Sequence, residues 1–112
     1  MIDYIFQLIN IENTFIGEAP IGIDDCQWIR LSGGNSEVHF AKGVYNRPIL
    51  SVYARGLNNQ ECSERINLIF NKLKNHTTGT SAYIVRRMPT FVGKDSKHRS
   101  LYSFQLECQI GG

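Results

Sequence analysis

The sequence predicts an α/β fold, in the α+β sense, with a mixed four-stranded β-sheet packed against one long helix and a short N-terminal helix. The first observation is the order strand, helix, strand over residues 49–88, which implies a right-handed crossover between two parallel strands. The second is the alternation of apolar and polar side chains over residues 101–110, which predicts a half-buried strand antiparallel to 82–88. The third is length, because 112 residues, 42% of them hydrophobic, suffice for one domain over 1–112 with its own core.

The first part of the chain predicts a helix, a loop and a strand. Apolar residues at positions 2, 5, 6 and 9 fall on one helical stripe that could extend to Asn13, so about three turns of helix are expected there. Proline and glycine punctuate residues 18–25, which predicts a loop. Residues 26–31 have the composition of a strand, and 32–35 carry a turn signal. Residues 36–47 are predicted to be loop.

The next strand is expected over residues 49–55. Its alternation should direct Leu50, Val52 and Ala54 toward a core, with Ser51 and Arg55 pointing away. Tyr53 lies on the face opposite Leu50 and Val52, as Tyr83 does relative to Ile84 on a later strand. Those tyrosines need cover, either from a neighbouring subunit or from the N-terminal helix.

A long helix is predicted from about Asn59 to Asn75. Asn58 and Glu61 have the spacing of a capping box at its start. Acidic residues in the first turns and lysines in the last suit the helix dipole. Its apolar residues fall on one face and should be buried: Cys62, Ile66, Ile69, Phe70 and Leu73.

The chain should close with two antiparallel strands joined by a long connection. The strand over 82–87 is expected to end near Pro89, because proline cannot donate to a ladder. The connection over 90–100 is long for a hairpin and rich in charge, so its tip is expected to project from the body.

Charge is distributed unevenly along the chain. Residues 1–40 have a net charge of −5 and the remainder +7, within a total of +2. Such a division suits a molecule whose copies meet head to tail. The alternative is that folding intermixes the two segments and leaves no dipole.

Residue patterns associated with catalysis or metal binding are missing from the sequence. The three histidines and three cysteines have no partners at ligand or triad spacing, and the adjacent Asp24 and Asp25 are a weak cation site without further oxygen ligands. We therefore expect no enzyme, no metal and no cofactor. The cysteines favour a reducing compartment, the start lacks a basic signal region, and no apolar run reaches the roughly 20 residues of a membrane span.

A basic cluster lies between residues 86 and 99. It consists of five basic residues against one acid, near Tyr83, Phe91 and Tyr102: Arg86, Arg87, Lys94, Lys97 and Arg99. Basic residues interleaved with aromatics are typical of nucleic-acid binding. The alternative is a solvated strand end and loop tip.

Three segments in order resemble the tail terminator, or tail-completion ("minor capsid"), proteins of long-tailed bacteriophages. Residues 20–34 resemble the family's segment of proline, aspartate, hydrophobic strand and Gly-Gly. Residues 48–56 and the helix after them are similar to its central strand and helix. Residues 89–99 and the alternating last strand are similar to its proline-to-arginine loop and closing strand. The family often has asparagine where Asp25 stands here.

The resemblance implies a structural virion protein rather than an enzyme. It implies a hexameric ring at the head-proximal end of the tail tube, which stops tube polymerisation and joins the tail to the head-completion or connector protein. The partners would be the chain itself, the tail tube protein and the connector, with assembly in the host cytoplasm. DNA would pass through the lumen without sequence-specific binding, and no membrane is involved. The alternatives are another head-tail joining or tail tube protein, or a small nucleic-acid-binding domain that uses the 86–99 cluster.

We expect the subunit or tube interface to include the loop that resembles the family's loop. In this hypothesis Phe91 is an apolar anchor beside Gly93, which supplies a positive φ. Basic side chains of the loop would contact acids of the net-negative segment, such as Glu18, in a neighbouring molecule. The full set of expected interface residues is Phe91, Gly93, Lys94, Asp95, Lys97, Arg99, Asp24 and Asp25.

Overall fold

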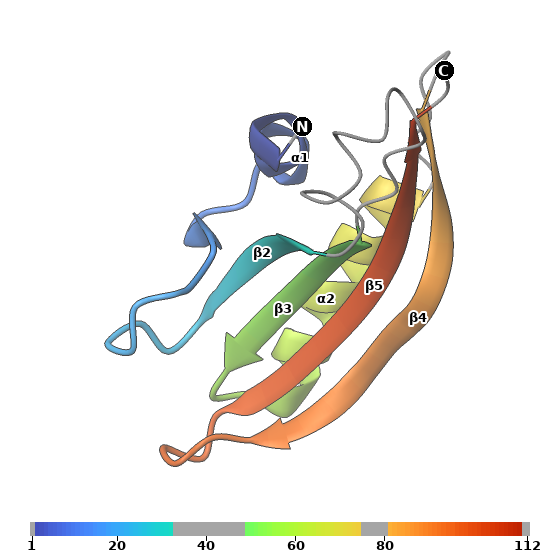
Figure 1. The fold of residues 1–112 in the computed structure, drawn as a ribbon. Helices are drawn as coiled ribbons and strands as arrows, with labels where there is room; N and C mark the ends of the chain where they lie inside the picture. Colours follow the sequence, from blue (N-terminus) through green and yellow to red (C-terminus); the bar gives the residue numbers. More distant parts are fainter. Residues whose placement is uncertain (1, 33–48, 75–80, 111–112) are drawn as a thin grey trace.

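The computed structural model describes residues 2–32, 49–74 and 81–110 and has a mixed α+β architecture (Figure 1). Helix α1 spans Ile2–Ile9 and helix α2 spans Asn59–Lys74. The strands are β1 (Thr14–Ile16), β2 (Cys26–Ser32), β3 (Ile49–Gly56), β4 (Ser81–Lys94) and β5 (Ser100–Ile110). The predicted turn beyond Ser32, the loop over 36–47, the helix end at Asn75, and His39 and His76 lie outside the described residues.

The strands form one sheet in the order β1-β2-β3-β5-β4. Both β3 and β4 pair antiparallel with β5, so β3 and β4 run parallel to each other. The predicted parallel relation and the antiparallel return of the last strand are therefore confirmed. The crossover through α2 skips one position, and β5 fills it (Figure 1).

The sheet has five strands in the described residues, so the prediction of four is wrong in this detail. The additional strand, β1, pairs parallel with β2, with Phe15 opposite Trp28. Only three residues long, it follows Asn13, whose φ of 60° ends any helical stripe before that position. A pattern of three residues is too short to distinguish a strand from a loop in the sequence. The pairing with β2 identifies this segment as a strand.

Strand β4 continues through Pro89 to Lys94, so the prediction that it stops near Pro89 is wrong. Among the described strands β4 is the sheet edge beyond β5, where a proline need not donate to a neighbour. Three register shifts against β5 mark bulges, between Val85 and Arg87, Arg87 and Thr90, and Phe91 and Gly93. The connection to β5 is accordingly the short segment 95–99, and the expected long projecting loop does not form.

Helix α2 covers one face of the sheet and supplies much of the core. The five helix residues expected to be buried are buried, and the Glu61 N–H donates to Asn58 Oδ1 at 2.9 Å, which confirms the N-cap. Leu50, Val52 and Ala54 face them from β3, as predicted, with Phe104 and Leu106 from β5. Phe70 meets Phe104 edge to face at 5.1 Å.

Helix α1 packs beside α2 and over the β1–β2 side of the sheet. Ile5 and Ile9 join the core, while Phe6 of the same predicted stripe stays partly exposed. Lys72 of α2 donates from Nζ to the Ile9 carbonyl at 2.9 Å, which ties the end of α1 to α2.

The face of the sheet opposite α2 carries aromatic side chains, including Tyr53, for which the sequence analysis predicted a need for cover. Trp28 and Tyr53 sit opposite each other on β2 and β3, and their rings stack with centroids 5.2 Å apart. The Arg30 guanidinium lies over the tyrosine ring and that of Arg55 over the indole, at 5.8 and 5.6 Å from the centroids. Tyr53 is thus partly covered by Trp28 and Arg30 of the same chain. The side chain of Tyr83 is outside the part of the chain that the structure describes.

Candidate functional site

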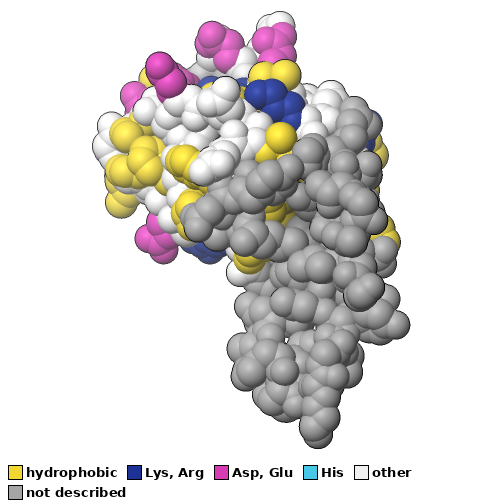
Figure 2. All heavy atoms as spheres, turned by 90° about the horizontal axis from the view of Figure 1, so that it is seen from above, with side chains coloured by type: hydrophobic (Ala, Val, Ile, Leu, Met, Phe, Trp, Pro, Cys, Tyr) yellow, Lys and Arg dark blue, Asp and Glu magenta, His cyan; other side chains and the backbone are white. Residues whose placement is uncertain are grey.

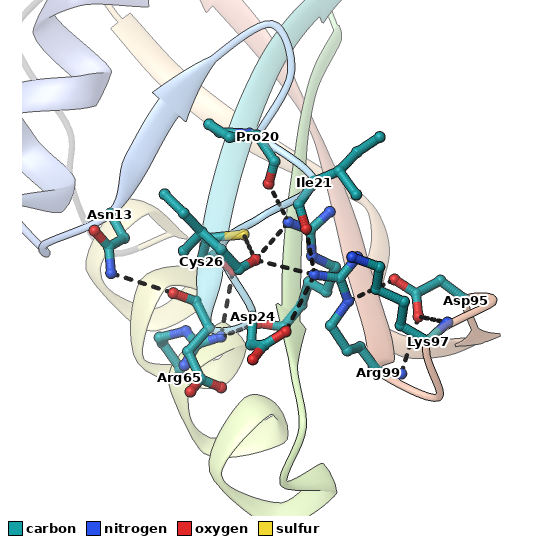
Figure 3. A network of polar contacts seen from close by, with 12 residues as sticks. Asn13, Pro20, Ile21, Asp24, Cys26, Arg65, Asp95, Lys97 and Arg99 are labelled. Carbon is teal, nitrogen blue, oxygen red and sulfur yellow. Dashed lines mark hydrogen bonds and ion pairs between the residues drawn. The ribbon is translucent and has the colours of Figure 1, made fainter.

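Four of the expected interface residues lie together at one corner of the molecule, near the starts of α2 and β5 (Figure 3): Asp24, Asp95, Lys97 and Arg99. Asp24 and Asp25 come from the segment before β2, Phe91–Lys94 from the end of β4, and 95–99 from the turn into β5. We call the polar network at their centre the arginine corner and define it by five residues: Asp24, Arg55, Arg65, Asp95 and Arg99. Residues from four parts of the chain therefore meet at one place.

Arg99 is the centre of this network and is almost fully buried. Its Nε donates to Asp95 Oδ2 at 2.8 Å, and its Nη1 donates to the Ile21 carbonyl at 2.7 Å. The same Nη1 lies 3.3 Å from both the Ile23 carbonyl and Asp24 Oδ1. The sequence placed this arginine on a projecting loop that reaches another molecule. The expectation of a projecting Arg99 is wrong, because it binds the acidic segment of its own chain.

Two further arginines, which the sequence analysis did not select, hold the same corner. Arg55 donates from Nη2 to the carbonyls of Pro20 and Ile23, at 2.6 Å each. Arg65 of α2 donates from Nη2 to the Arg55 carbonyl at 2.6 Å and to the Cys26 carbonyl at 3.3 Å. Arg55 was expected to point away from the core, and it does, but the 18–25 loop folds over it and buries it.

The turn between β4 and β5 is organised by Asp95. Its Oδ1 accepts the main-chain N–H groups of Lys97 at 2.9 Å and Arg99 at 3.0 Å. These bonds, above all that from the Arg99 main chain, lower the pKa of the Asp95 carboxyl below its ordinary value. Gly93 has φ 147°, which confirms the predicted positive φ, and His98 has φ 61°. An Asx-type turn with a left-handed residue explains how five residues reverse the chain.

The remaining predicted residues form the solvent-facing rim of the corner. Asp25, Lys94 and Lys97 are exposed, and Asp24 keeps half of its side chain in solvent while its Oδ1 binds Arg99. Phe91 is half-exposed and packs edge to face on Tyr102, with centroids 5.4 Å apart. The Tyr102 hydroxyl donates to Asn59 Oδ1 at 3.0 Å, which anchors that aromatic pair at the start of α2.

The arginines of the corner donate mainly to main-chain carbonyls, so they hold the 18–25 loop against the sheet. Burial raises the pKa of the Cys26 thiol, and burial raises that of Cys62 to about 11, which disfavours the nucleophilic thiolate. Across the part of the chain that the structure describes, no three His, Cys, Asp or Glu side chains converge as metal ligands.

Neither helix of the described residues combines the length and the apolar character needed to cross a membrane.

Comparison with protein families identifies a match for this chain. No curated protein matches the chain. The model of the family described as "Bacteriophage tail terminator protein" matches residues 4–111, which is nearly the whole chain and includes every element of the sheet. The chain therefore belongs to the bacteriophage tail terminator protein family.

Proposed function

We propose that this tail protein forms a hexameric ring at the head-proximal end of the phage tail tube, stops tube polymerisation and joins the tail to the head connector. The observation that carries the proposal is the family match over residues 4–111. The partners in this proposal are further copies of the chain, the tail tube protein and the head-completion or connector protein. Assembly takes place in the host cytoplasm, and DNA crosses the lumen without being read.

The rim of the arginine corner is the proposed contact surface to a neighbouring subunit or to the tail tube. Phe91 is the apolar anchor, and Lys94, Lys97 and Asp25 are exposed charges around it. Arg99 acts in this proposal as a positioning residue. By fixing the 18–25 loop and the 95–99 turn against each other, it keeps the rim in one arrangement, so less conformational entropy is lost on docking.

The contacts of the basic cluster over residues 86–99 argue against the nucleic-acid alternative. Arg86 binds Glu107 at 2.9 Å, Arg87 donates to Ser103 Oγ at 2.7 Å, and Arg99 is buried. Three of its five basic side chains are thus engaged within the chain. Phosphate binding relies on many accessible Lys and Arg side chains, and the cluster supplies few of them.

The decisive experiment combines the purified chain with polymerising tail tube protein. We expect negative-stain images to show finite rings of the chain alone, and tubes that stop growing once capped. A variant with Phe91→Ala and Lys94→Glu should bind tube ends at least about tenfold more weakly, with Leu68→Ala, on the exposed side of α2, as the matched control. Long tubes formed by the chain itself, or tube growth unaffected by it, would refute the proposal. Retention on DNA at low salt would favour the nucleic-acid alternative.

A further inference from the structure

Strand β4 is a sheet edge with an unusual surface. Its 14 residues extend about 46 Å, whereas the 16 residues of α2 extend about 24 Å, so part of the strand lies beyond the cover of the helix. Large hydrophobic side chains are exposed along it: Ile84, Val85, Met88, Phe91 and Val92. They make up half of the exposed large hydrophobic residues in the described part of the chain. An exposed hydrophobic edge of this length is a site for association.

The charge of β4 has one sign. The strand carries Arg86, Arg87 and Lys94 and no acidic residue. Arg86 keeps half of its side chain in solvent while it binds Glu107. Arg86 and Arg87 also have contacts within the chain, whereas Lys94 is exposed, so apolar contacts together with acidic groups would suit a partner at this edge.

The opposite edge of the same sheet has that chemistry. Residues 10–18, which include β1, carry Glu12 and Glu18 and no basic residue, whereas Asp24 and Asp25 belong to the arginine corner and its rim. Ile16 on this segment is exposed, and Glu18 meets Arg30 only loosely, at 3.7 Å. Figure 2, seen from above, shows hydrophobic side chains gathered on the left of the described surface with acidic side chains around them. Figure 1 places residues 10–18 on that side, and β1 and β4 are the two edge strands of the sheet.

We infer that copies of this chain associate head to tail, with the β4 edge of one copy against residues 10–18 of the next. The inference rests on the proposed ring and names the contact that closes it. Two different edges of one molecule meet in such a contact, which is the heterologous arrangement that gives rings when the rotation closes. Each subunit has one β4 edge and one β1 edge, so in the ring every β4 edge meets the β1 edge of the next subunit.

Strand directions support the same arrangement. Following the pairings from β4 through β5, β3 and β2, strand β1 runs opposite to β4. A neighbour rotated about an axis along the strands therefore presents β1 antiparallel to β4. Main-chain groups of Asn13 and Gly17 point toward β2, so by alternation those of Ile16 point to the open side. Pro89 and the bulges of β4 prevent a long continuous ladder, so side chains carry most of this contact.

Cysteine cross-linking tests the contact directly. In a Cys108→Ser background, Ile16→Cys and Met88→Cys are introduced together, and the assembled protein is treated with a short bis-maleimide. We expect a ladder of covalent oligomers from the double variant, whereas a mixture of the two single variants should stop at dimers. The control pair is Ile16→Cys with Leu68→Cys, whose second cysteine lies on the exposed side of α2 and should give no ladder. Dimers from Met88→Cys alone would indicate a symmetric contact and overturn the inference.

Charge reversal gives an independent readout. Arg86→Glu with Arg87→Glu, or Glu12→Arg with Glu18→Arg, should each lower ring formation at least about tenfold, and the four changes together should restore it. Circular dichroism checks that each variant folds. Rings that form normally without a cross-linked ladder and without charge rescue would overturn this contact and leave the proposed function standing. Failure of the unaltered chain to form rings under electron microscopy would remove the ring and this contact together.

Discussion

Replacing Arg99 by methionine isolates the contribution of the arginine corner. Methionine keeps an apolar stem of similar length but removes the side-chain donations to Asp95, Asp24 and the carbonyls of Ile21 and Ile23. The main-chain N–H of residue 99 can still donate to Asp95 Oδ1. The variant therefore tests the guanidinium while the turn itself keeps its main-chain bonds.

The loss of unfolding free energy depends on how well water can reach the oxygen atoms that no longer accept a hydrogen bond from Arg99. Breaking a fully buried ion pair costs about 3–5 kcal/mol. Here Asp24 is half-exposed and Asp95 about one-fifth exposed, so water can replace part of what is lost. We expect the free energy of unfolding to fall by about 2–4 kcal/mol, since bonds from a charged donor contribute about 1.5–3 kcal/mol.

Urea denaturation followed by Trp28 fluorescence measures this loss. A small domain has a urea m-value of about 1–3 kcal/mol/M, so the midpoint should fall by about 1–3 M with little change in slope. Lys97→Met is the matched control, because Lys97 lies in the same turn with an exposed side chain, and its effect should stay within about 0.5 kcal/mol. An Arg99→Met variant as stable as Lys97→Met would refute the account of the corner as a clamp.

Four other substitutions test separate parts of the structure. Ile69→Asp should prevent folding, because an unpaired buried charge costs several kcal/mol against a total stability of about 5–15 kcal/mol. Leu68→Asp, on the exposed side of α2, is the control and should fold. A folded Ile69→Asp protein in circular dichroism would show that this face is not core. The raised pKa of Cys62 means that the folded state holds this proton between about pH 9 and 11, so stability fully present below pH 9 should decline by up to about 1.4 kcal/mol per pH unit across that window. Cys62→Ala should remove that decline in urea titrations at pH 9 and 10.5, and identical slopes in both proteins would contradict the burial. The lowered pKa of Asp95 stabilises the fold above its ordinary pKa of 3.8 and loses that effect as pH falls through the folded value, so Asp95→Asn should flatten the acid limb of the stability profile. Gly93→Ala should lower the melting temperature, with a loss of about 1 kcal/mol, because alanine strongly disfavours φ 147°; an unchanged melting temperature would argue against that conformation.

The local sequence pattern alone was enough to predict helix α2 and the strands β3 and β5. The core face of α2 follows from the spacing of Ile66, Ile69 and Leu73, and Asn58 caps it as its spacing with Glu61 predicts. The alternation of the strand containing Leu50 likewise fixed which of its faces is buried. These features depend on contacts between near neighbours in sequence or on a strict periodicity, and both can be read without knowing the partner.

Tertiary structure decided the rest, because the deciding contacts join residues far apart in sequence. Strand β1 exists through its pairing with β2, and β4 passes Pro89 because the strand lies at an edge. Arg99 reads as a charge on a loop, yet it is buried because carbonyls some 76 to 78 residues earlier fold over it. Charge patterning suggested head-to-tail association, and the strand order places β1, with Glu12 and Glu18 near it, and the basic strand β4 at opposite edges of one sheet. The sequence shows which groups need hydrogen-bonding or packing partners, and the tertiary structure determines which residues those partners are.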